Sequence, residues 1–429
     1  MKKKYRIILY TSIFLLCVVA SIILVVKKSN SVYEEESKPK VVKHKSMLSM
    51  NLEQTAGSGD YKTVTQSKWP TEGYKFNAEL SRCENGSTLS WDDTKKAVIV
   101  SGNLSDKCYV YFDIYQPTLA EYIKSQYTGT QGENNIYYHD SDLANGAGDN
   151  SYRYAGANPN NFVCFGSDTS PCPTDNLYRI IGVFGENYHG VTGKQLVKLI
   201  KYDYMTTDEL GTDGDYSQTY KEWGMDSTYK GTYGDGERIG VYYWNYKATG
   251  SATNTWSTSL LNKTNLNTNF INYLGTTWAN KIATVTWKVG GNTWANIGTK
   301  TSSVAYTNEI TNPVTTNTTD NATTYSAKIG LMYVSDYGFA ASPDAWTLTM
   351  SSYNNTTATN NNWMYMGLYE WTISRGADGS NIAFYVYYDG YVYGYNVRYY
   401  YGVRASFNLE SSVSYVSGSG SMSDPIVIN

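Results

Sequence analysis

The chain has 429 residues, of which 35 are Lys or Arg and 38 are Asp or Glu, so its formal net charge is -3. This balance excludes a general basic surface of the kind that binds nucleic acid. Only 17% of the residues are charged, and the length is sufficient for two or three domains.

An uncharged apolar run comes first along the chain. As a helix, residues 7–26 would be about 30 Å long, which matches the hydrocarbon core of a bilayer. Four basic residues precede the run, and only Lys27 and Lys28 follow it closely. The positive-inside rule favours a single-pass cell-membrane protein, with residues 1–26 as cytoplasmic tip and transmembrane anchor and the remainder exported. The alternative is a cleaved signal peptide, although the run is long for one and no A-x-A site follows.

Two segments of different composition follow the apolar run. Residues 27–50 are charged and poor in aromatic side chains, which is typical of a flexible stalk. Residues 51–115 carry short apolar alternations such as 97–100 and 108–112, separated by turn residues. This pattern predicts a small β-sandwich-like module.

The cysteines agree with export. Apart from Cys17 in the apolar run, they form two local pairs in the sequence, Cys83 with Cys108 and Cys164 with Cys172. An even number of exported cysteines predicts disulfides, and local pairing is the simplest of the three connectivities. Neither pair has the spacing of a zinc site.

A larger domain is predicted over residues 116–429. It opens with a helix over 118–127, because Thr118 can cap the helix and Glu121 can complete a capping box. The next predicted elements are a loop region over 128–176, strands over 177–184 and 195–200, helices over 257–274 and 278–283, and an exposed loop over 299–325.

Tyrosine is concentrated near the end of this domain, where nine of the seventeen residues in 385–401 are Tyr. Tyrosine is favoured on recognition surfaces, but it is also a strand former, so the window is either a binding surface or an aromatic-rich sheet. A hairpin is predicted from strands 384–388 and 391–397 with a type I′ turn at Asp389-Gly390, followed by a third strand over 399–409. About half of the tyrosines should point outward, because strand side chains alternate between two faces.

Catalytic and metal-binding patterns are weak. The sequence has no G-x-S-x-G, Walker A or HExxH motif, so no enzyme activity is predicted. His139 and His189 lie in polar or glycine-flanked loops. Thr212–Asp215 and Gly234–Glu237 offer oxygen ligands without matching an EF-hand loop, so no metal or cofactor is expected and calcium is the one candidate.

Three short blocks occur in order near the C-terminus: Leu368–Thr372 (LYEWT), Arg375-Gly376 and Gly402–Arg404 (GVR). They resemble the N-V-W-E-W-T, R-G-G and G-F-R blocks of the formylglycine-generating-enzyme-like branch of the C-type lectin fold. Ala377 replaces the second glycine of R-G-G, and Val403 replaces the phenylalanine of G-F-R. Enzymes of that family need reactive cysteines late in the chain, whereas no cysteine follows Cys172.

The chain is more similar to another branch of that fold, the variable proteins of diversity-generating retroelements. In that family, adenine-directed mutagenesis rewrites a segment between the second and third blocks, and it favours codons for Tyr, Asn, Asp and Ser. Residues 378–401 are rich in these residues. The resemblance implies an α+β, β-rich chain with a C-type-lectin-like domain over 116–429 and a variable segment over 378–401.

These observations predict a cell-surface protein that binds a protein or glycan through a Tyr-rich face. The alternatives are a self-associating surface or pilus-like protein and, less favoured, an extracellular enzyme. The predicted ligand-binding residues are Tyr385, Tyr387, Tyr388, Asp389, Tyr391, Tyr393, Tyr395, Asn396, Tyr399 and Tyr401. The predicted scaffold residues are Glu370, Trp371, Arg375 and Arg404, with Glu370 as a candidate partner for a buried Arg404.

Overall fold

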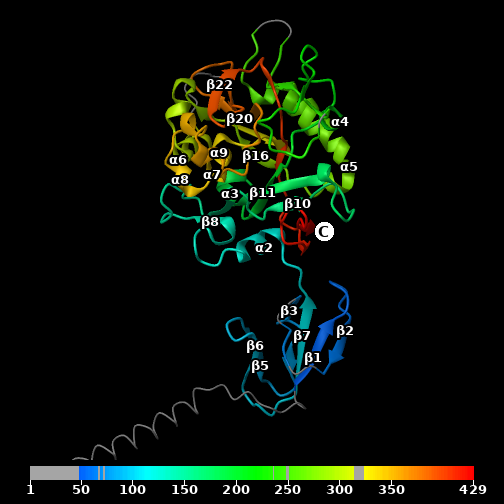
Figure 1. Ribbon diagram of the computed structural model, residues 1–429. Helices are drawn as coiled ribbons and strands as arrows, with labels where there is room; N and C mark the ends of the chain where they lie inside the picture. Colours follow the sequence, from blue (N-terminus) through cyan, green and yellow to red (C-terminus); the bar gives the residue numbers. More distant parts are fainter. Residues whose placement is uncertain (1–47, 66–67, 71–72, 235, 248–250, 314–322) are drawn as a thin grey trace, which may run out of the picture. The chain divides into compact units, whose positions relative to one another are not determined.

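The computed structural model describes residues 48–65, 68–70, 73–234, 236–247, 251–313 and 323–429. The chain divides into two compact units, Met1–Tyr115 and Gln116–Asn429 (Figure 1). The predicted anchor lies outside the described residues, and within the described ranges no helix is both long and apolar enough to cross a bilayer. The predicted stalk extends too far, because the first strand already begins at Leu48.

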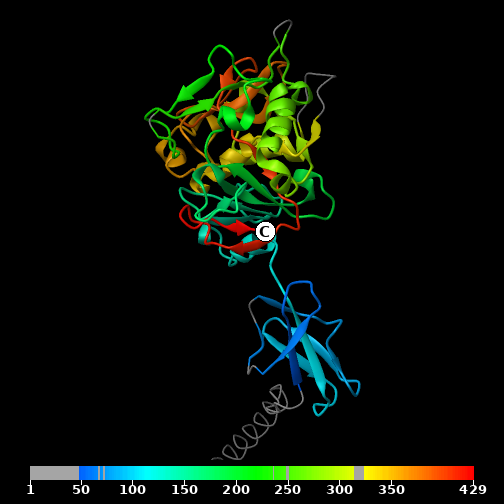
Figure 2. The ribbon, with the colours of Figure 1, turned by 90° about the vertical axis from the view of Figure 1, so that its right-hand side faces the viewer.

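The described part of the first unit, from Leu48 to Tyr115, is a small module whose regular elements are all strands (Figure 2). Its main sheet has the order β2-β1-β7-β3, with β4 also paired to β7, while β5 and β6 form a separate hairpin. The core is formed by Met50, Leu52, Val110 and Phe112, and side chains of the hairpin pack against it. The strands are β1 Leu48–Glu53, β2 Tyr61–Val64, β3 Tyr74–Phe76, β4 Arg82–Cys83, β5 Thr88–Asp92, β6 Ala97–Ser101 and β7 Cys108–Ile114.

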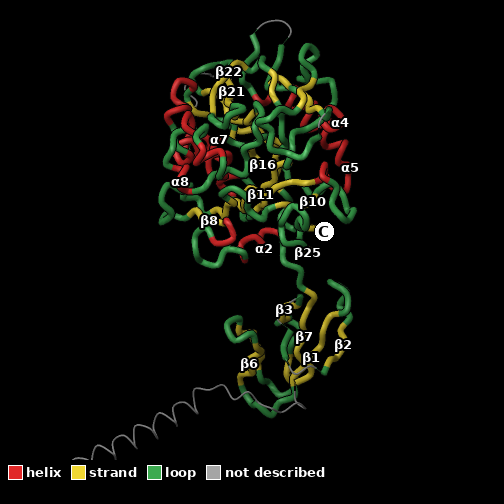
Figure 3. Tube along the Cα trace, viewed as in Figure 1, coloured by secondary structure: helices red, strands yellow, loops and turns green. Residues whose placement is uncertain are grey.

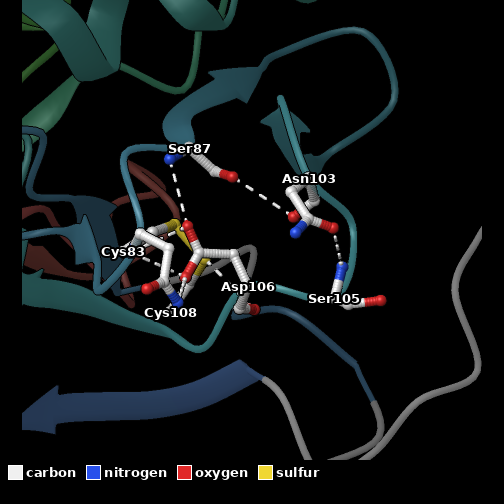
Figure 4. The surroundings of a disulfide bond; sticks show 7 residues. Cys83, Ser87, Asn103, Ser105, Asp106 and Cys108 are labelled. Carbon is white, nitrogen blue, oxygen red and sulfur yellow. Dashed lines mark hydrogen bonds between the residues drawn. A yellow bond between two sulfur atoms is a disulfide. The ribbon is translucent and has the colours of Figure 1, made fainter.

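A disulfide joins two strands of this module. Cys83 and Cys108 lie directly opposite each other on β4 and β7 and are bonded, as predicted (Figure 4). The carboxylate of Asp106 accepts hydrogen bonds from the backbone nitrogens of Asn85, at 2.9 Å, and Ser87, at 3.1 Å. The turn over residues 85–87 is thereby held against Asp106, beside the disulfide. In the second unit, Cys164 and Cys172 are also bonded, as predicted.

Replacing Cys83 and Cys108 together by Ala should lower the free energy of unfolding of the first unit by about 3 kcal/mol, because the disulfide closes a loop of 25 residues around a small core. Chemical denaturation of the full chain, followed by hydrogen exchange in each unit, measures this loss. The double Ala variant of Cys164 and Cys172 is the control, and equal protection of the first unit in all three proteins would contradict the prediction.

The second unit combines short strands and short helices joined by long loops (Figure 3). In the described chain, 32% of residues are in strands and 21% in helices, which confirms the strand-rich α+β class. Its strands are β8 Ile136–His139, β9 Ser151–Tyr154, β10 Phe162–Cys164, β11 Leu177–Phe184, β12 Leu196–Lys201, β13 Glu222–Gly224, β14 Arg238–Gly240, β15 Tyr242–Tyr243, β16 Val285–Lys288, β17 Gly291–Asn292, β18 Thr324–Ala327, β19 Ile329–Gly330, β20 Glu370–Gly376, β21 Ile382–Val386, β22 Val392–Asn396, β23 Tyr400–Tyr401, β24 Ser406–Asn408, β25 Tyr415–Ser417 and β26 Val427–Ile428.

The helices are mostly one or two turns long. The α-helices are α2 Leu119–Ser125, α3 Glu186–His189, α4 Thr207–Leu210, α5 Ile271–Ala279, α6 Ser302–Tyr306, α7 Val334–Ala340, α8 Pro343–Trp346 and α9 Thr356–Thr359. The 3-10 and π-helical segments are η1 Glu133–Asn135, η2 Thr174–Asn176, η3 Trp256–Thr258, η4 Leu261–Phe270, η5 Trp294–Thr299, η6 Thr307–Thr311 and η7 Met350–Ser352.

Two sheets position the rest of the second unit. A seven-stranded sheet has the order β19-β24-β12-β11-β9-β8, with β10 also paired to β11. A four-stranded sheet has the order β17-β20-β21-β22 and contains Tyr385, Tyr393 and Tyr395 of the tyrosine window. Figure 1 shows β20 and β22 at the opposite end of this unit from α2 and the C-terminus. Every residue of β11, β12 and β20 is buried, so both sheets have centres that are covered on both faces.

Several predicted elements are confirmed. Helix α2 has the expected capping box, in which the Glu121 backbone nitrogen donates to Thr118 Oγ1 at 3.2 Å. The strand over 177–184 has the predicted bounds, and its neighbour spans Leu196–Lys201. The predicted helix over 257–274 is observed from Leu261, and the left-handed Gly275 (φ +71°) interrupts it where expected.

Three predicted elements are wrong. The segment 128–176 contains β8, β9 and β10 rather than only loop, because Ile136, Tyr154 and Val163 enter the core. The segment 299–325 contains α6 and η6, which bury Tyr306 and Ile310. The strand predicted over 399–409 is divided into β23 and β24, because β23 pairs with β15 whereas β24 pairs with β12 and β19 in the other sheet.

A cluster of charged side chains is buried between β9, β12, η6 and α7. Arg153 Nη2 lies 2.7 Å from Asp149 Oδ2, and Lys198 Nζ lies 2.6 Å from Asp336 Oδ2. Glu309 accepts hydrogen bonds from the Ser335 backbone nitrogen, at 3.1 Å, and from the hydroxyl of Ser374. Burial raises the pKa of Glu309 to about 7, so this carboxyl is largely protonated in the folded protein below that pH.

Replacing Glu309 by Gln should change how stability depends on pH. The folded state keeps the Glu309 proton until about pH 7, whereas the unfolded chain releases it near the ordinary value of 4.5. Ionisation therefore destabilises the native protein as pH rises from about 4.5 to about 7, and the Gln variant lacks this loss. Melting temperatures measured across this range should diverge between the two proteins. The exposed Glu410→Gln variant is the control, and parallel curves for native protein and Glu309→Gln would contradict the prediction.

Candidate recognition face

Position within the sheet decides which tyrosines of the window are exposed. Trp371 on β20, Tyr385 on β21 and Tyr393 on β22 are in register and therefore lie in one row on the same face. Their exposed fractions are 0%, 3% and 42%. Exposure thus increases from the centre of the sheet to its edge, and alternation along the strand does not by itself place a tyrosine at the surface.

Two predicted ligand-binding residues are buried, which corrects the sequence prediction. Tyr385 is 3% exposed and Tyr401 is 7% exposed, and their ring centroids are 4.5 Å apart. Both pack against Trp371, with centroid distances of 5.9 and 4.5 Å. Burial raises the pKa of both phenols. Tyr385 and Tyr401 belong to the core under the window, because Tyr369 also packs against both rings, at 6.1 and 5.2 Å between centroids.

The other predicted tyrosines reach the surface. Tyr388, Tyr393, Tyr395 and Tyr399 are exposed, while Tyr387 and Tyr391 are half-buried. The rings of Tyr387 and Tyr391 stack at 4.5 Å, and Tyr395 meets Tyr399 edge to face at 4.2 Å. The surface tyrosines therefore pack against one another in pairs.

The two polar residues of the window fix turns. Asn396 Oδ1 accepts a hydrogen bond from the Arg398 backbone nitrogen at 3.1 Å, and Asp389 Oδ1 faces the Tyr391 nitrogen at 3.5 Å. Both side chains are half-buried, so each leaves part of its surface available for a ligand.

The turn of the hairpin differs from the predicted type. The Tyr387 backbone nitrogen donates to the Tyr391 carbonyl at 2.8 Å, and the Gly390 backbone nitrogen donates to the Tyr387 carbonyl at 2.9 Å. Gly390 has a positive φ of 106°, whereas Asp389 does not have the positive φ that a type I′ turn requires. The connection is therefore a three-residue loop with a glycine bulge. Tyr337 of α7 donates to the Gly390 carbonyl at 2.7 Å, which anchors the tip.

A second segment, which the sequence analysis missed, adds aromatic residues to the window. β15 pairs with β23 and brings Tyr243 opposite Tyr400. Tyr220 is 51% exposed and stacks on Tyr400 at 3.7 Å, while the exposed Tyr246 stacks on Tyr243 at 4.5 Å. The signal in the sequence was a second concentration of Tyr and Trp over residues 216–246.

Ring contacts connect the two segments. Trp223 lies 5.8 Å from Tyr369 and 6.1 Å from Tyr400, and Tyr369 lies 4.7 Å from Tyr387. The remaining rings join this series through pairwise contacts. Tyr220, Tyr243 and Tyr399 each contact Tyr400, and Tyr246 and Tyr395 join through Tyr243 and Tyr399. Tyr388 and Tyr391 contact Tyr387, and Tyr393 contacts Tyr391. We call the surface members of this series the tyrosine face: Tyr220, Tyr243, Tyr246, Tyr387, Tyr388, Tyr391, Tyr393, Tyr395, Tyr399 and Tyr400.

The four predicted scaffold residues are buried. Arg404 Nε is 2.8 Å from Glu370 Oε1, and its Nη2 donates to the Met364 carbonyl at 2.7 Å, so the expected partner is observed. Burial raises the pKa of Glu370, and the Arg404 charge opposes that rise. Trp371 Nε1 donates to the Tyr242 carbonyl at 2.9 Å, which joins β20 to β15. Arg375 Nε donates to the Val289 carbonyl at 2.6 Å.

The candidate metal ligands have other partners. Asp215 accepts hydrogen bonds from the Tyr246 and Leu261 nitrogens, at 3.0 and 2.8 Å. His139 is buried, and its Nδ1 accepts from the Ala147 nitrogen at 3.1 Å. His189 Nδ1 likewise accepts from the Val191 nitrogen. Among the described side chains, no group of three or more His, Cys, Asp or Glu is arranged to hold an ion.

No known family model matches the chain, and neither a curated protein nor a solved structure is significantly similar to it. The resemblance to the C-type lectin fold therefore depends on residues 368–404 alone.

Core and face should respond differently to substitution. Arg404→Ala leaves Glu370 buried without its partner and should cost about 3–5 kcal/mol of stability. Trp371→Ala and Tyr385→Ala should each cost a similar amount, about 3–5 kcal/mol, because each leaves a cavity. Tyr393→Ala and Tyr395→Ala should change stability by less than about 0.5 kcal/mol. Denaturant titration of the second unit measures these differences. A loss at Tyr393 as large as that at Trp371 would show that the face is core.

Proposed function

We propose that the chain is an exported, membrane-anchored surface protein that binds a protein or glycan ligand through the tyrosine face, on a C-type-lectin-like scaffold. The observation that carries this proposal is the continuous series of ring contacts that ends in exposed tyrosines from two separate segments. Large exposed aromatic patches of this kind are uncommon on monomeric proteins and are typical of interaction sites.

The chemistry of the face suits recognition. Tyrosine offers a large rigid ring and one hydroxyl, so it gains contact area with little loss of side-chain freedom. Burial raises the pKa of Tyr391 to about 12, and the hydrogen bond with Tyr395 raises the pKa of Tyr399. These phenols stay protonated at neutral pH and can both donate and accept hydrogen bonds.

The scaffold supports the same proposal. Tyr388, Tyr393, Tyr395 and Tyr399 are exposed, whereas the Glu370–Arg404 pair that holds β20 is buried, so replacing these tyrosines need not unfold the domain. A surface that tolerates substitution on a fixed frame is what the resemblance to retroelement variable proteins implies.

Replacing Tyr388, Tyr393, Tyr395 and Tyr399 together by Ala should abolish ligand binding, since truncating a single aromatic hot spot costs roughly 2 kcal/mol or more. The full chain in detergent would be tested against panels of glycans and of extracellular protein domains. Tyr273→Ala is the matched control, because Tyr273 is 48% exposed but belongs to α5 outside the face.

The same variants separate the alternatives. A ligand that binds native protein and the Tyr273 control but not the four-residue variant supports the proposal. A ligand that binds all three proteins equally would contradict it. Self-association of the native chain that disappears in the four-residue variant would favour the structural, pilus-like alternative, and analytical ultracentrifugation measures it.

Retroelement diversification makes a separate prediction about DNA. A reverse-transcriptase gene should lie nearby, with a near-repeat of the codons for 378–404 that differs at adenines. Because Tyr385 and Tyr401 are buried whereas Tyr393 and Tyr399 are exposed, natural variants should keep the first pair and differ at the second. Sequencing of the locus from related strains tests both points. An absent repeat, or variation concentrated at Tyr385 and Tyr401, would contradict diversification.

A further inference from the structure

A lysine and an aspartate are in direct contact in the core of the second unit, among residues that the tyrosine face does not use. Lys198 on β12 and Asp336 on α7 are 2.6 Å apart between Nζ and Oδ2, and neither side chain is exposed at all. The rings of Tyr333, Tyr188 and Trp287 surround the amine, with centroids 4.3, 4.8 and 5.0 Å from Nζ. Two charges in such apolar surroundings are costly to desolvate.

These surroundings favour a reactive form of the lysine. Burial lowers the pKa of Lys198 to about 8, although Asp336 opposes this effect. An amine of this kind is more often in its neutral, nucleophilic form than an exposed lysine is. Contact with the carboxyl group also removes the entropic cost of bringing the two groups together.

The carboxyl group of Asp336 is held by hydrogen-bond donors. Tyr188 donates its hydroxyl to Oδ1 at 2.7 Å, and the Tyr333 nitrogen donates to Oδ2 at 3.0 Å. Arg153 Nη1 is buried, lies 3.9 Å from Oδ1 and has no hydrogen-bond partner among the described residues. A negative charge that develops on Oδ1 would therefore meet one donor already in place and, next to it, the Arg153 guanidinium, which also pairs with Asp149.

We propose that Lys198 and Asp336 react to form an intramolecular amide bond that joins β12 to α7. The Nζ–Cγ bond forms and the Cγ–Oδ2 bond breaks. Oδ2 leaves as one water molecule with two protons of the lysine ammonium group, while Oδ1 becomes the amide oxygen. The ion pair supplies every atom of the products, so the reaction needs no co-reactant.

The bond would connect residues 138 positions apart in the sequence. It would replace two buried charges by one neutral amide, which removes the desolvation cost of the pair. Lys201 offers a comparison within the same strand. It is also buried and lies 3.0 Å from Glu209 Oε1, and each lysine has a second acceptor, the Asp175 carbonyl for Lys201 and the Tyr188 hydroxyl for Lys198. The two sites differ in their aromatic surroundings, because among the described rings only that of Tyr178 lies near Lys201, at 5.7 Å.

Mass spectrometry of the full chain, reduced and digested, tests the proposal. We expect one branched peptide that contains Lys198 and Asp336 and is lighter than the sum of its two parts by one water. Recovery of both linear peptides from native protein, with no branched peptide, would overturn the proposal. Peptide masses decide this whether or not the N-terminus is processed.

Two variants assign the bond. Lys198→Arg keeps the positive charge but lacks the amine, so it should yield only the linear Asp336 peptide. Lys201→Arg should keep the branched peptide. A lost water that persists in Lys198→Arg would place the modification elsewhere and overturn the proposal. If Lys198→Arg does not fold, fragmentation of the native branched peptide still identifies the joined residues.

Discussion

The burial of β20 is the constraint on which the second unit depends. All seven residues of this strand are buried, so each of its polar side chains must find a partner inside the protein. Glu370 meets Arg404, Thr372 donates to the Phe384 carbonyl at 2.8 Å, and Ser374 bonds to Glu309. These partners come from the tyrosine hairpin, from η6 and from the segment after β23, so β20 ties the tyrosine hairpin to the rest of the unit.

The sequence predicted features that depend on local chemistry. The capping box at Thr118, the strand over 177–184 and both disulfides follow from neighbouring residues or from simple pairing. The partner of Arg404 was also identified, because a buried guanidinium needs an acceptor and Glu370 lay in the resembling block. In each of these cases the sequence offers few other partners for the same polar groups or cysteines.

Features that depend on long-range packing were predicted less well. The alternation of side chains along a strand predicted that Tyr385 is exposed. Its strand β21, however, lies between β20 and β22, and the sequence alone does not show which strands pair. The contribution of Tyr220 and Tyr246 required the pairing of β15 with β23, which joins residues far apart in the chain. A strand over 399–409 looked continuous because local propensity does not show where a chain passes from one sheet to another.

The anchored tip of the hairpin limits how this surface can evolve. The Gly390 carbonyl is bound by Tyr337, and a Cβ at Gly390 would lie 2.9 Å from the Tyr353 carbonyl oxygen, so the turn is pressed against the helices behind it. An inserted or deleted residue between Tyr387 and Tyr391 would move the glycine away from this contact and shift the register of every tyrosine beyond it. Under the proposed recognition function, new specificities would therefore arise at constant length, by exchanging side chains on an unchanged backbone.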